Sequence, residues 1–275
     1  MGEAAGRPDE RAGRLMVILA DPLSPLIDKG EVTARYYNPG DVFTEVDFVI
    51  CAVDEPERAA VQQMVGNARF AIHCFPIGRE WTVRSLFWRP LLLRAWTRPI
   101  VELARVRQPQ VVRCYHNRYN AFAAAEIKRL LGIPYVVSLH AHPETSQVKR
   151  LSSAYVRHRL REAALEGISR HGLAGAAAIL PVYSPIVPWL QRRGVSNYEI
   201  VYNAVGTLEG PVERKPRGAM LRAINVGRQD ADVKDPTPII EAVAARDDVK
   251  LTVVGNGPLH EALVGRVAAL GAQDR

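Results

Sequence analysis

The sequence predicts a doubly wound α/β protein in which a first parallel-sheet domain is followed by the beginning of a second. Apolar runs of strand length recur along the chain with helical patterns between them, and the runs are continuous rather than alternating. Continuous hydrophobicity is typical of strands that are buried on both faces of a parallel sheet. Strands that alternate with helices in this way build a sheet covered by helices on both sides.

Seven strands are expected in the first domain, at residues 15–20, 46–53, 69–75, 110–115, 134–140, 177–183 and 198–205. Two of the helices between them have recognisable ends. One runs from the cap candidate Asn120 to Gly132, and another, at residues 152–172, is expected to end on Gly172.

The domain boundaries follow from changes in composition. Residues 1–13 are a predicted disordered leader, residues 14–205 the first domain, and residues 206–219, which mix Gly, Pro and charge without periodicity, a linker. The alternation restarts in residues 220–275, but two strands and two helices are too little to bury an independent core. The chain is therefore expected to be cut short at its C-terminal end.

Composition narrows the class and the compartment. The 275 residues are 48% hydrophobic and 24% charged, which is typical of a globular protein. No apolar run reaches a membrane span, and the first residues lack the apolar stretch of a secretory signal. Three separated cysteines favour buried thiols in a reducing compartment, so we expect a cytoplasmic protein, and no Cys/His spacing indicates a metal site.

The positive charge is concentrated in one segment. The net charge is +7, and residues 78–113 hold eight arginines against Glu80 and Glu102. A local basic surface indicates an anionic partner. No nucleic-acid-binding signature accompanies it, so nucleic acid is not expected to be that partner.

This basic segment combines arginine with tryptophan. Its helical spacing places three tryptophans on roughly one face with four arginines around the rest: Trp81, Trp88 and Trp96, with Arg84, Arg89, Arg94 and Arg98. One interpretation is an anionic membrane interface. The other is a helical hairpin that packs its tryptophans inward while the arginine stems reach outward. Pro90 and Pro99 predict two short helices with a bend.

Two cations follow the first strand of the second domain. Arg228 ends the run 222–228, and Lys234 precedes Asp235, a cap candidate for the helix that begins near Pro236. Ligands of open α/β sheets collect at the carboxyl ends of strands, where two cations can hold a diphosphate. The alternative is a pair of solvated surface cations.

The next strand ends in a glycine-rich turn. Residues 255–258 read Gly-Asn-Gly-Pro and precede a helix, so a ligand can approach the backbone closely at Gly255 and Gly257. The segment lacks the dinucleotide-binding spacing of glycines. An ordinary turn explains it equally well.

Taken together and in order, these segments resemble family 4 glycosyltransferases. The similar segments are "GIPYVVSLHAHPE", "ILPVYSPIVPWLQRRG", "IVYNAV", "VGRQDADVKDPTPIIEAVA" and "VKLTVVGNGPLHEAL". The resemblance implies a GT-B type architecture of two Rossmann-like domains, with an acceptor-side N-terminal domain and a nucleotide-sugar-binding second domain. It also implies retaining transfer of a sugar from a UDP- or GDP-sugar, which is a substrate, with no cofactor and no obligatory metal.

The resemblance assigns roles to individual residues. Arg228 and Lys234 match the pair that binds the donor diphosphate, and Gly255 and Gly257 match the loop beside the nucleotide. His140 matches a catalytic-site histidine that faces the donor sugar. The alternative for His140 is a strand-end histidine that hydrogen-bonds a nearby carbonyl.

Three departures from the family pattern stand out. The paired-glycine loop after the first strand is reduced to Gly30, which either admits donor phosphate or forms a plain turn. The usual Asn-Gly after the seventh strand is Asn203-Ala204, and Asn203 is expected to close the domain structurally. The family's two donor-site glutamates have no counterpart before Arg275, so the chain as given is expected to lack full activity.

The acceptor side is less defined by sequence. His116, Asn117 and Arg118 follow a strand and are acceptor-site candidates. The resemblance implies a glycan or lipid-linked acceptor in the cell envelope and, if the interfacial interpretation holds, a peripheral location at the inner face of the membrane. Two alternatives remain: a nucleotide-sugar 2-epimerase of the same architecture, and a non-catalytic membrane-associated fragment.

Overall fold

The computed structural model describes residues 13–140, 165–203, 210, 218, 220–230 and 234–275, and for residues 79–92 it describes the helical backbone alone. The chain divides into two compact units. The described residues of unit 1 run from 13 to 203, and those of unit 2 from 210 to the end.

Unit 1 is built on one parallel sheet of six strands in the order β3-β2-β1-β4-β5-β6. The strands are β1 (Arg14–Leu19), β2 (Glu45–Ile50), β3 (Arg69–Cys74), β4 (Val111–Tyr115), β5 (Tyr135–Leu139) and β6 (Ala178–Pro181). All five pairings are parallel, with Val17 opposite Phe48 on one side and Arg113 on the other. The strand order is that of the doubly wound fold, which confirms the predicted fold class.

The seventh predicted strand is the exception. Residues 198–203 run beside β6 through one isolated bridge between Ile179 and Tyr198, and the N–H of Glu199 donates to the Ile179 carbonyl at 3.0 Å. The prediction of a regular strand was wrong here. Three backbone hydrogen bonds join residues 197–201 to β6, but Val201 and Tyr202 are exposed, so the apolar run did not indicate a buried strand here.

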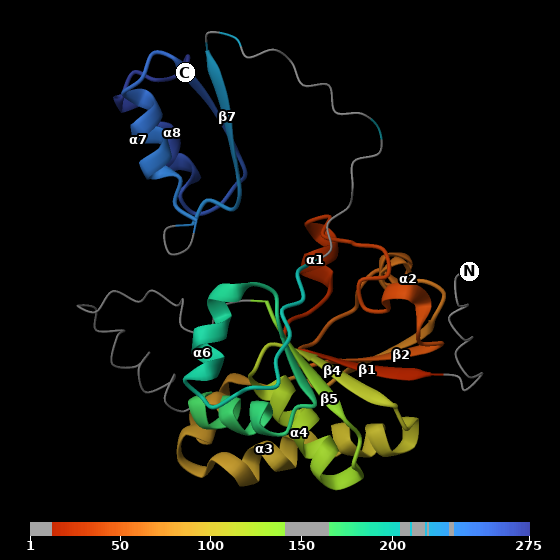
Figure 1. The fold of residues 1–275 in the computed structure, drawn as a ribbon. Helices are drawn as coiled ribbons and strands as arrows, with labels where there is room; N and C mark the ends of the chain where they lie inside the picture. Colours follow the sequence, from red (N-terminus) through yellow and green to blue (C-terminus); the bar gives the residue numbers. More distant parts are fainter. Residues whose placement is uncertain (1–12, 141–164, 204–209, 211–217, 219, 231–233) are drawn as a thin grey trace, which may run out of the picture. The chain divides into compact units, whose positions relative to one another are not determined.

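Each face of the sheet has its own core. Figure 1 shows α3 (Arg79–Arg107) and α4 (Tyr119–Leu131) on one face, and α1 (Ser24–Asp28) and α2 (Arg58–Val65) on the other. Alternate strand residues supply the two sides, such as Met16 and Ile18 toward α3 and α4, and Leu15 and Val17 toward α2. Burial on both faces explains the continuous apolar runs. Shorter elements complete the unit: η1 (Pro39–Asp41), η2 (Ser184–Ile186) and α6 (Val187–Gln191).

Helix α3 is one continuous helix of 29 residues. The expected break into two helices at Pro90 and Pro99 was therefore wrong. A proline inside a helix costs about 3 kcal/mol. The burial of apolar side chains on both sides of Pro99 offsets that cost. These side chains are Leu93, Trp96, Ile100, Val101 and Ala104.

The helix predicted to stop at Gly172 continues to Ala174. A Cβ on Gly172 would lie 2.7 Å from the Cβ of Ala121 in α4. The glycine therefore marks a close helix-helix contact, whereas Gly132, with a φ of 74°, does end α4 as predicted. Helix α4 begins one residue before Asn120, whose side-chain oxygen accepts a bond from the Arg118 N–H at 3.3 Å.

Charged side chains gather at the amino ends of the first strands. Asp47 is fully buried and receives a hydrogen bond from Arg107 Nε at 2.9 Å and lies 3.3 Å from His73 Nε2. Burial opposes ionisation, but the hydrogen bonds from His73 and Arg107 outweigh it and hold the pKa of Asp47 below its usual value. Glu45 beside it pairs with Arg14, Arg69 and Arg107.

Unit 2 contains two parallel strands, β7 (Leu221–Val226) and β8 (Val249–Val254), and two helices, α7 (Thr237–Ala244) and α8 (His260–Ala269). The inner faces of these helices carry the buried residues Ile240, Val243 and Leu263. The side chain of Asp235 accepts a hydrogen bond from the Thr237 N–H at 2.9 Å, so it caps the start of α7 as the sequence predicts.

Candidate functional site

Two adjoining cavities, each of about 370 Å³, open at the carboxyl ends of the strands in unit 1. They share four lining residues, Thr33, Tyr36, His140 and Asn203. The first cavity is also lined by Leu19, Asp21, Glu31, Tyr115 and His116, and the second by Arg35, Arg113, Ser138 and Tyr202. This is the edge of a doubly wound sheet at which ligands bind.

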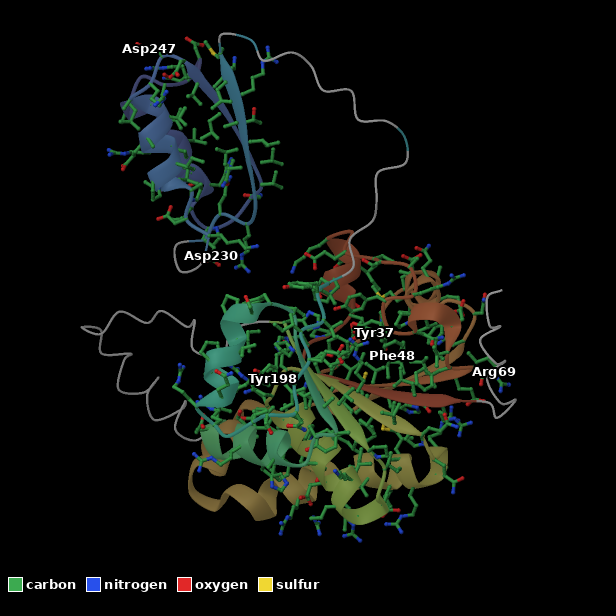
Figure 2. The ribbon with its side chains drawn as sticks, viewed as in Figure 1. Tyr37, Phe48, Arg69, Tyr198, Asp230 and Asp247 are labelled. Carbon is green, nitrogen blue, oxygen red and sulfur yellow. The ribbon has the colours of Figure 1, made fainter. Side chains whose placement is uncertain are left out.

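Aromatic side chains form the floor of this site. Tyr37 meets Phe48 of β2 edge to face, with 5.0 Å between ring centroids, and meets Tyr115 in the same manner at 5.4 Å. Figure 2 shows Tyr37 and Phe48 together, while Arg69, which begins β3, lies toward the opposite end of the strands. The loop that carries Tyr36 and Tyr37 is thereby anchored to the sheet beside the cavities.

His140 follows β5 directly and lines both cavities. Its Nδ1 lies 3.5 Å from the hydroxyl of Tyr36, and its ring centroid is 5.2 Å from that of Tyr115. Its Nε2 is buried and has no hydrogen-bond partner among the described residues. Burial, helped by nearby His116 and Arg113, lowers the pKa of His140 to about 4. The imidazole is therefore neutral at pH 7 and keeps one nitrogen for a ligand.

The three acceptor-side candidates separate in the structure. His116 lines the first cavity with a φ of +72°, and its N–H donates to the Ser138 carbonyl at 2.8 Å. Burial lowers its pKa as well. Asn117 is 9% exposed and donates to the Ser169 hydroxyl, whereas Arg118 is exposed and lines neither cavity.

Gly30 and Asn203 differ in their position relative to the cavities. Gly30 has a φ of +71° just after α1, donates to the Ile27 carbonyl at 2.8 Å and is not a lining residue. This is the geometry of a helix-ending turn. Asn203 is exposed and lines both cavities, so its expected role of closing the domain is replaced by a place at the site.

Asp21, Glu31, Tyr36 and Arg113 are among the site residues that were not identified from the sequence. Asp21 follows β1 within two residues, and a polar residue at a strand's carboxyl end is a usable signal. Arg113 carried another signal, a charge inside a buried strand. Tyr36 and Glu31 lie in the irregular segment between α1 and β2, where no pattern marks them.

In unit 2, Arg228 and Lys234 both lie near the carboxyl end of β7. The Arg228 side chain is 66% exposed, and its Nε lies 3.5 Å from a carboxylate oxygen of Asp230. Lys234 exchanges backbone hydrogen bonds with Asp230, and its Cδ lies 3.6 Å from the place a Cβ on Gly227 would take. Both ammonium and guanidinium groups are thus carried by one short loop.

Gly255 and Gly257 are required by packing between the two loops that follow β7 and β8. A Cβ on Gly255 would lie 1.9 Å from the Gly227 carbonyl oxygen, and one on Gly257 would lie 2.2 Å from that of Gln229. No side chain fits at such distances. The glycines therefore allow backbone to meet backbone, a cause that the sequence did not reveal.

Gln229 joins these loops and was also missed from the sequence. It is 4% exposed, its N–H donates to the Asn256 carbonyl at 3.0 Å, and its side-chain amide donates to the Gly255 carbonyl at 3.1 Å. Its Oε1 lies 2.9 Å from His260 Nδ1. One buried amide thus fixes the shape of the loop that carries Arg228.

The described part of the basic segment favours inward packing. Trp96 is 7% exposed and its indole N–H donates to the Phe75 carbonyl at 3.2 Å, so its assignment to a membrane surface was wrong. Arg94 lies 3.5 Å from the buried carboxylate of Glu126, and Arg98 is exposed. The side chains of Trp81, Arg84, Trp88 and Arg89 lie outside the described residues.

None of the helices in the described ranges combines the length and the apolar character needed to cross a bilayer. Within the same ranges, no three His, Cys, Asp or Glu side chains are grouped so as to hold a metal ion.

The sequence relationship decides the family. Residues 44–207, more than half of the chain, match the model described as Glycosyltransferase Family 4. The chain belongs to glycosyltransferase family 4. No curated protein sequence matches the chain significantly.

A solved structure that aligns with a TM-score above 0.5 supports the fold. The apo form of the lipopolysaccharide outer core galactosyltransferase WaaB aligns with a TM-score of 0.60 and 16% identity, over 95% of this chain and 66% of that one. Spinosyn rhamnosyltransferase SpnG complexed with thymidine diphosphate aligns with a TM-score of 0.44 and 20% identity, over 91% and 67%. UDP-GlcNAc 2-epimerase from Methanocaldococcus jannaschii gives 0.45 and 12%, over 95% and 69%. This family 4 chain spans about two thirds of their length.

Proposed function

We propose that this family 4 protein transfers a sugar, with retention of configuration, from a UDP- or GDP-sugar to an envelope glycan or lipid-linked acceptor. The observation that carries the proposal is the family match over residues 44–207 together with the cavities at the strand ends of the same unit. A site of this size suits a sugar-sized ligand.

His140 is the proposed catalytic-site residue. It contacts the donor sugar in this proposal, and its pKa of about 4 keeps it neutral at physiological pH. A neutral imidazole offers one N–H donor and one acceptor nitrogen. The Nε2 atom, which lacks a partner among the described residues, is the atom proposed to hydrogen-bond the sugar. His116, on the first cavity, is proposed to contact the acceptor.

Arg228 and Lys234 are proposed to bind the donor diphosphate. Both are exposed cations near the carboxyl end of β7, and charge-assisted bonds to phosphate oxygens stabilise a departing nucleotide. Gly255 and Gly257 are proposed to lie beside the nucleotide, in a loop whose shape their backbone contacts fix. For Gly30, its hydrogen bond to the Ile27 carbonyl supports the alternative role of a plain turn.

A donor-turnover assay on the full-length protein tests this function. We expect Arg228→Ala to lower kcat/KM about a hundredfold or more, because preorganised charge at the leaving group is lost. Arg222→Ala, an exposed arginine on β7, is the matched control and should turn over normally. Near-normal turnover by Arg228→Ala would refute the diphosphate assignment. An epimerised nucleotide-sugar as product, in place of a glycosylated acceptor, would favour the 2-epimerase.

The proposed location is cytoplasmic and peripheral at the inner membrane surface. Liposome co-sedimentation with Arg84, Arg89 and Arg94 changed to Ser tests the basic segment. Arg94 contacts Glu126, so Arg129→Ser, which removes another arginine from the same carboxylate, is the control. Loss of binding in the triple variant alone supports a membrane surface, and unchanged binding excludes it. Binding without any sugar transfer would favour the non-catalytic fragment.

A further inference from the structure

Arg113 is a charged residue in the middle of a buried strand. Its neighbours Val112 and Cys114 lie in the core under α3 and α4, so Arg113 points to the other face of the sheet. There its guanidinium lies over the ring of Tyr115, 4.9 Å from the centroid, and its Nε donates to the Ser138 hydroxyl at 3.1 Å. These contacts hold the guanidinium in one orientation at the second cavity.

No carboxylate pairs with Arg113 among the described residues. The other arginines near the sheet differ: Arg14 and Arg107 pair with Glu45 or Asp47. At the second cavity, Arg35 pairs with Asp41 at 3.0 Å, and no described lining residue is acidic. A partly buried cation without a counter-ion is costly, so an anion in this cavity would be stabilised.

The electrostatic field of Arg113 reaches the groups around it. Burial raises the pKa of Tyr36 and Tyr115, and Arg113 acts against that rise. Arg113 also contributes, after burial and His116, to the lowered pKa of His140. The same cavity presents neutral donors from Ser138 and Asn203. A fixed cation beside neutral hydrogen-bond donors is an arrangement that binds an anionic oxygen group.

We propose that the second cavity is an anion-binding subsite centred on Arg113, which takes a carboxylate or phosphate group of the acceptor. The identification of the anion as the acceptor's rests on the proposed function, whereas the binding of an anion at Arg113 does not. The acceptor class is thereby narrowed to sugars that carry an acidic substituent near the hydroxyl that receives the donor sugar.

Calorimetry on the full 275-residue chain tests the subsite with three probes: glucuronate, glucose 6-phosphate and glucose. We expect at least one anionic probe to bind at least tenfold more tightly than glucose, with an affinity that falls as salt rises. Preference for glucuronate identifies a carboxylate, and preference for glucose 6-phosphate identifies a phosphate. Equal binding of all three probes would overturn the proposal.

Variants assign the effect to Arg113. Arg113→Gln should weaken the anionic probe at least tenfold and leave glucose unchanged. Arg105→Gln, which removes an equal charge from an exposed ion pair on α3, should bind as the unchanged chain does. If thermal melting shows that Arg113→Gln is unfolded, Arg113→Lys takes its place, because it keeps the charge without the fork of donors. Its affinity for the anionic probe should be lower than that of the unchanged chain. Full affinity in both Arg113 variants would overturn the proposal.

The two proposals fail separately. Absence of sugar transfer with every donor refutes the proposed function but leaves the calorimetric result for Arg113 standing. Conversely, a protein that transfers sugar while Arg113→Gln binds and processes an acidic acceptor normally refutes the subsite alone.

Discussion

Replacing Gly255 by Ala should break the joint between the two loops of unit 2. The new Cβ would lie 1.9 Å from the Gly227 carbonyl oxygen and 2.9 Å from its carbon, so the loops must separate by about 1 Å. Two of the backbone hydrogen bonds across the joint, from Gly227 to Val254 and from Gln229 to Asn256, are each 3.0 Å long. A shift of that size would leave neither bond intact.

The expected cost combines two effects. Each lost backbone hydrogen bond contributes about 1 kcal/mol. The φ of Gly255, +142°, adds strain of about 1 to 3 kcal/mol for a residue with a side chain. We therefore expect the free energy for opening unit 2 to fall by about 3 to 5 kcal/mol.

Hydrogen exchange measured by mass spectrometry on the full chain reports this opening through the amides of β7 and β8. The control is Gly265→Ala in α8, where no atom lies within 4 Å of the new Cβ. That change should stabilise α8 by about 0.5 to 1 kcal/mol and so slow the exchange of its amides. Unaltered exchange in Gly255→Ala, with loss of nucleotide binding alone, would refute the packing explanation and favour a glycine kept for the ligand.

Three further predictions concern unit 1. His140 should titrate near pH 4 in an NMR pH series; since its folded pKa lies below its unfolded value, stability from this group is complete above about pH 6.5 and is lost toward pH 4. A His140 midpoint near 6.5 would contradict its burial. Cys74 should react first with a thiol reagent, because it is exposed while burial raises the pKa of Cys51 to about 12 and raises that of Cys114. Equal reactivity of all three thiols in the folded chain would argue against these positions. Asp47→Asn should lower the free energy of unfolding in urea by about 1.5 to 3 kcal/mol, since the partly exposed Arg107 loses its charged hydrogen-bond acceptor. A loss below about 1 kcal/mol would show that the pair is solvated.

The sheet of unit 1 was readable from sequence because its strands are buried on both faces. Continuous apolar runs such as residues 15–20 indicate two-sided burial, which β1 and β2 show fully, whereas β3 at the edge of the sheet is only partly buried. Residues 198–203 show the limit of that signal. Val201 and Tyr202 are apolar yet exposed, and the described part of this segment forms one bridge, at Tyr198.

Local rules also failed where tertiary packing opposed them. Pro99 predicts a break, yet α3 continues because Trp96 and Ile100 on either side of it are buried in the same core. Gly172 predicts a stop, but its lack of a side chain serves the contact with Ala121. Both outcomes depend on neighbours that are distant in sequence.

The residues of the candidate site also differ in how far the sequence could indicate them. His140 could be identified because it follows a strand directly and matches a family segment. Its partner Tyr36 is 104 residues away in an irregular segment, and only the folded chain brings the two together. Gln229 was missed for a related reason, because its importance lies in bonds to backbone groups of a second loop.

The ion-pair cluster around Asp47 and the cavities of unit 1 lie toward opposite ends of the strands of one sheet. Asp47 and its partners anchor the edge at which the strands begin, and the cavities open where the strands finish. The ion pairs of Asp47 are consequently separated in space from the cavities, whereas part of the apolar core lines the first cavity. A mutagenesis library should therefore vary exposed lining positions such as Tyr202 and Asn203, and leave unchanged the lining residues that belong to the core: Leu19, Tyr37, Met64 and Tyr115.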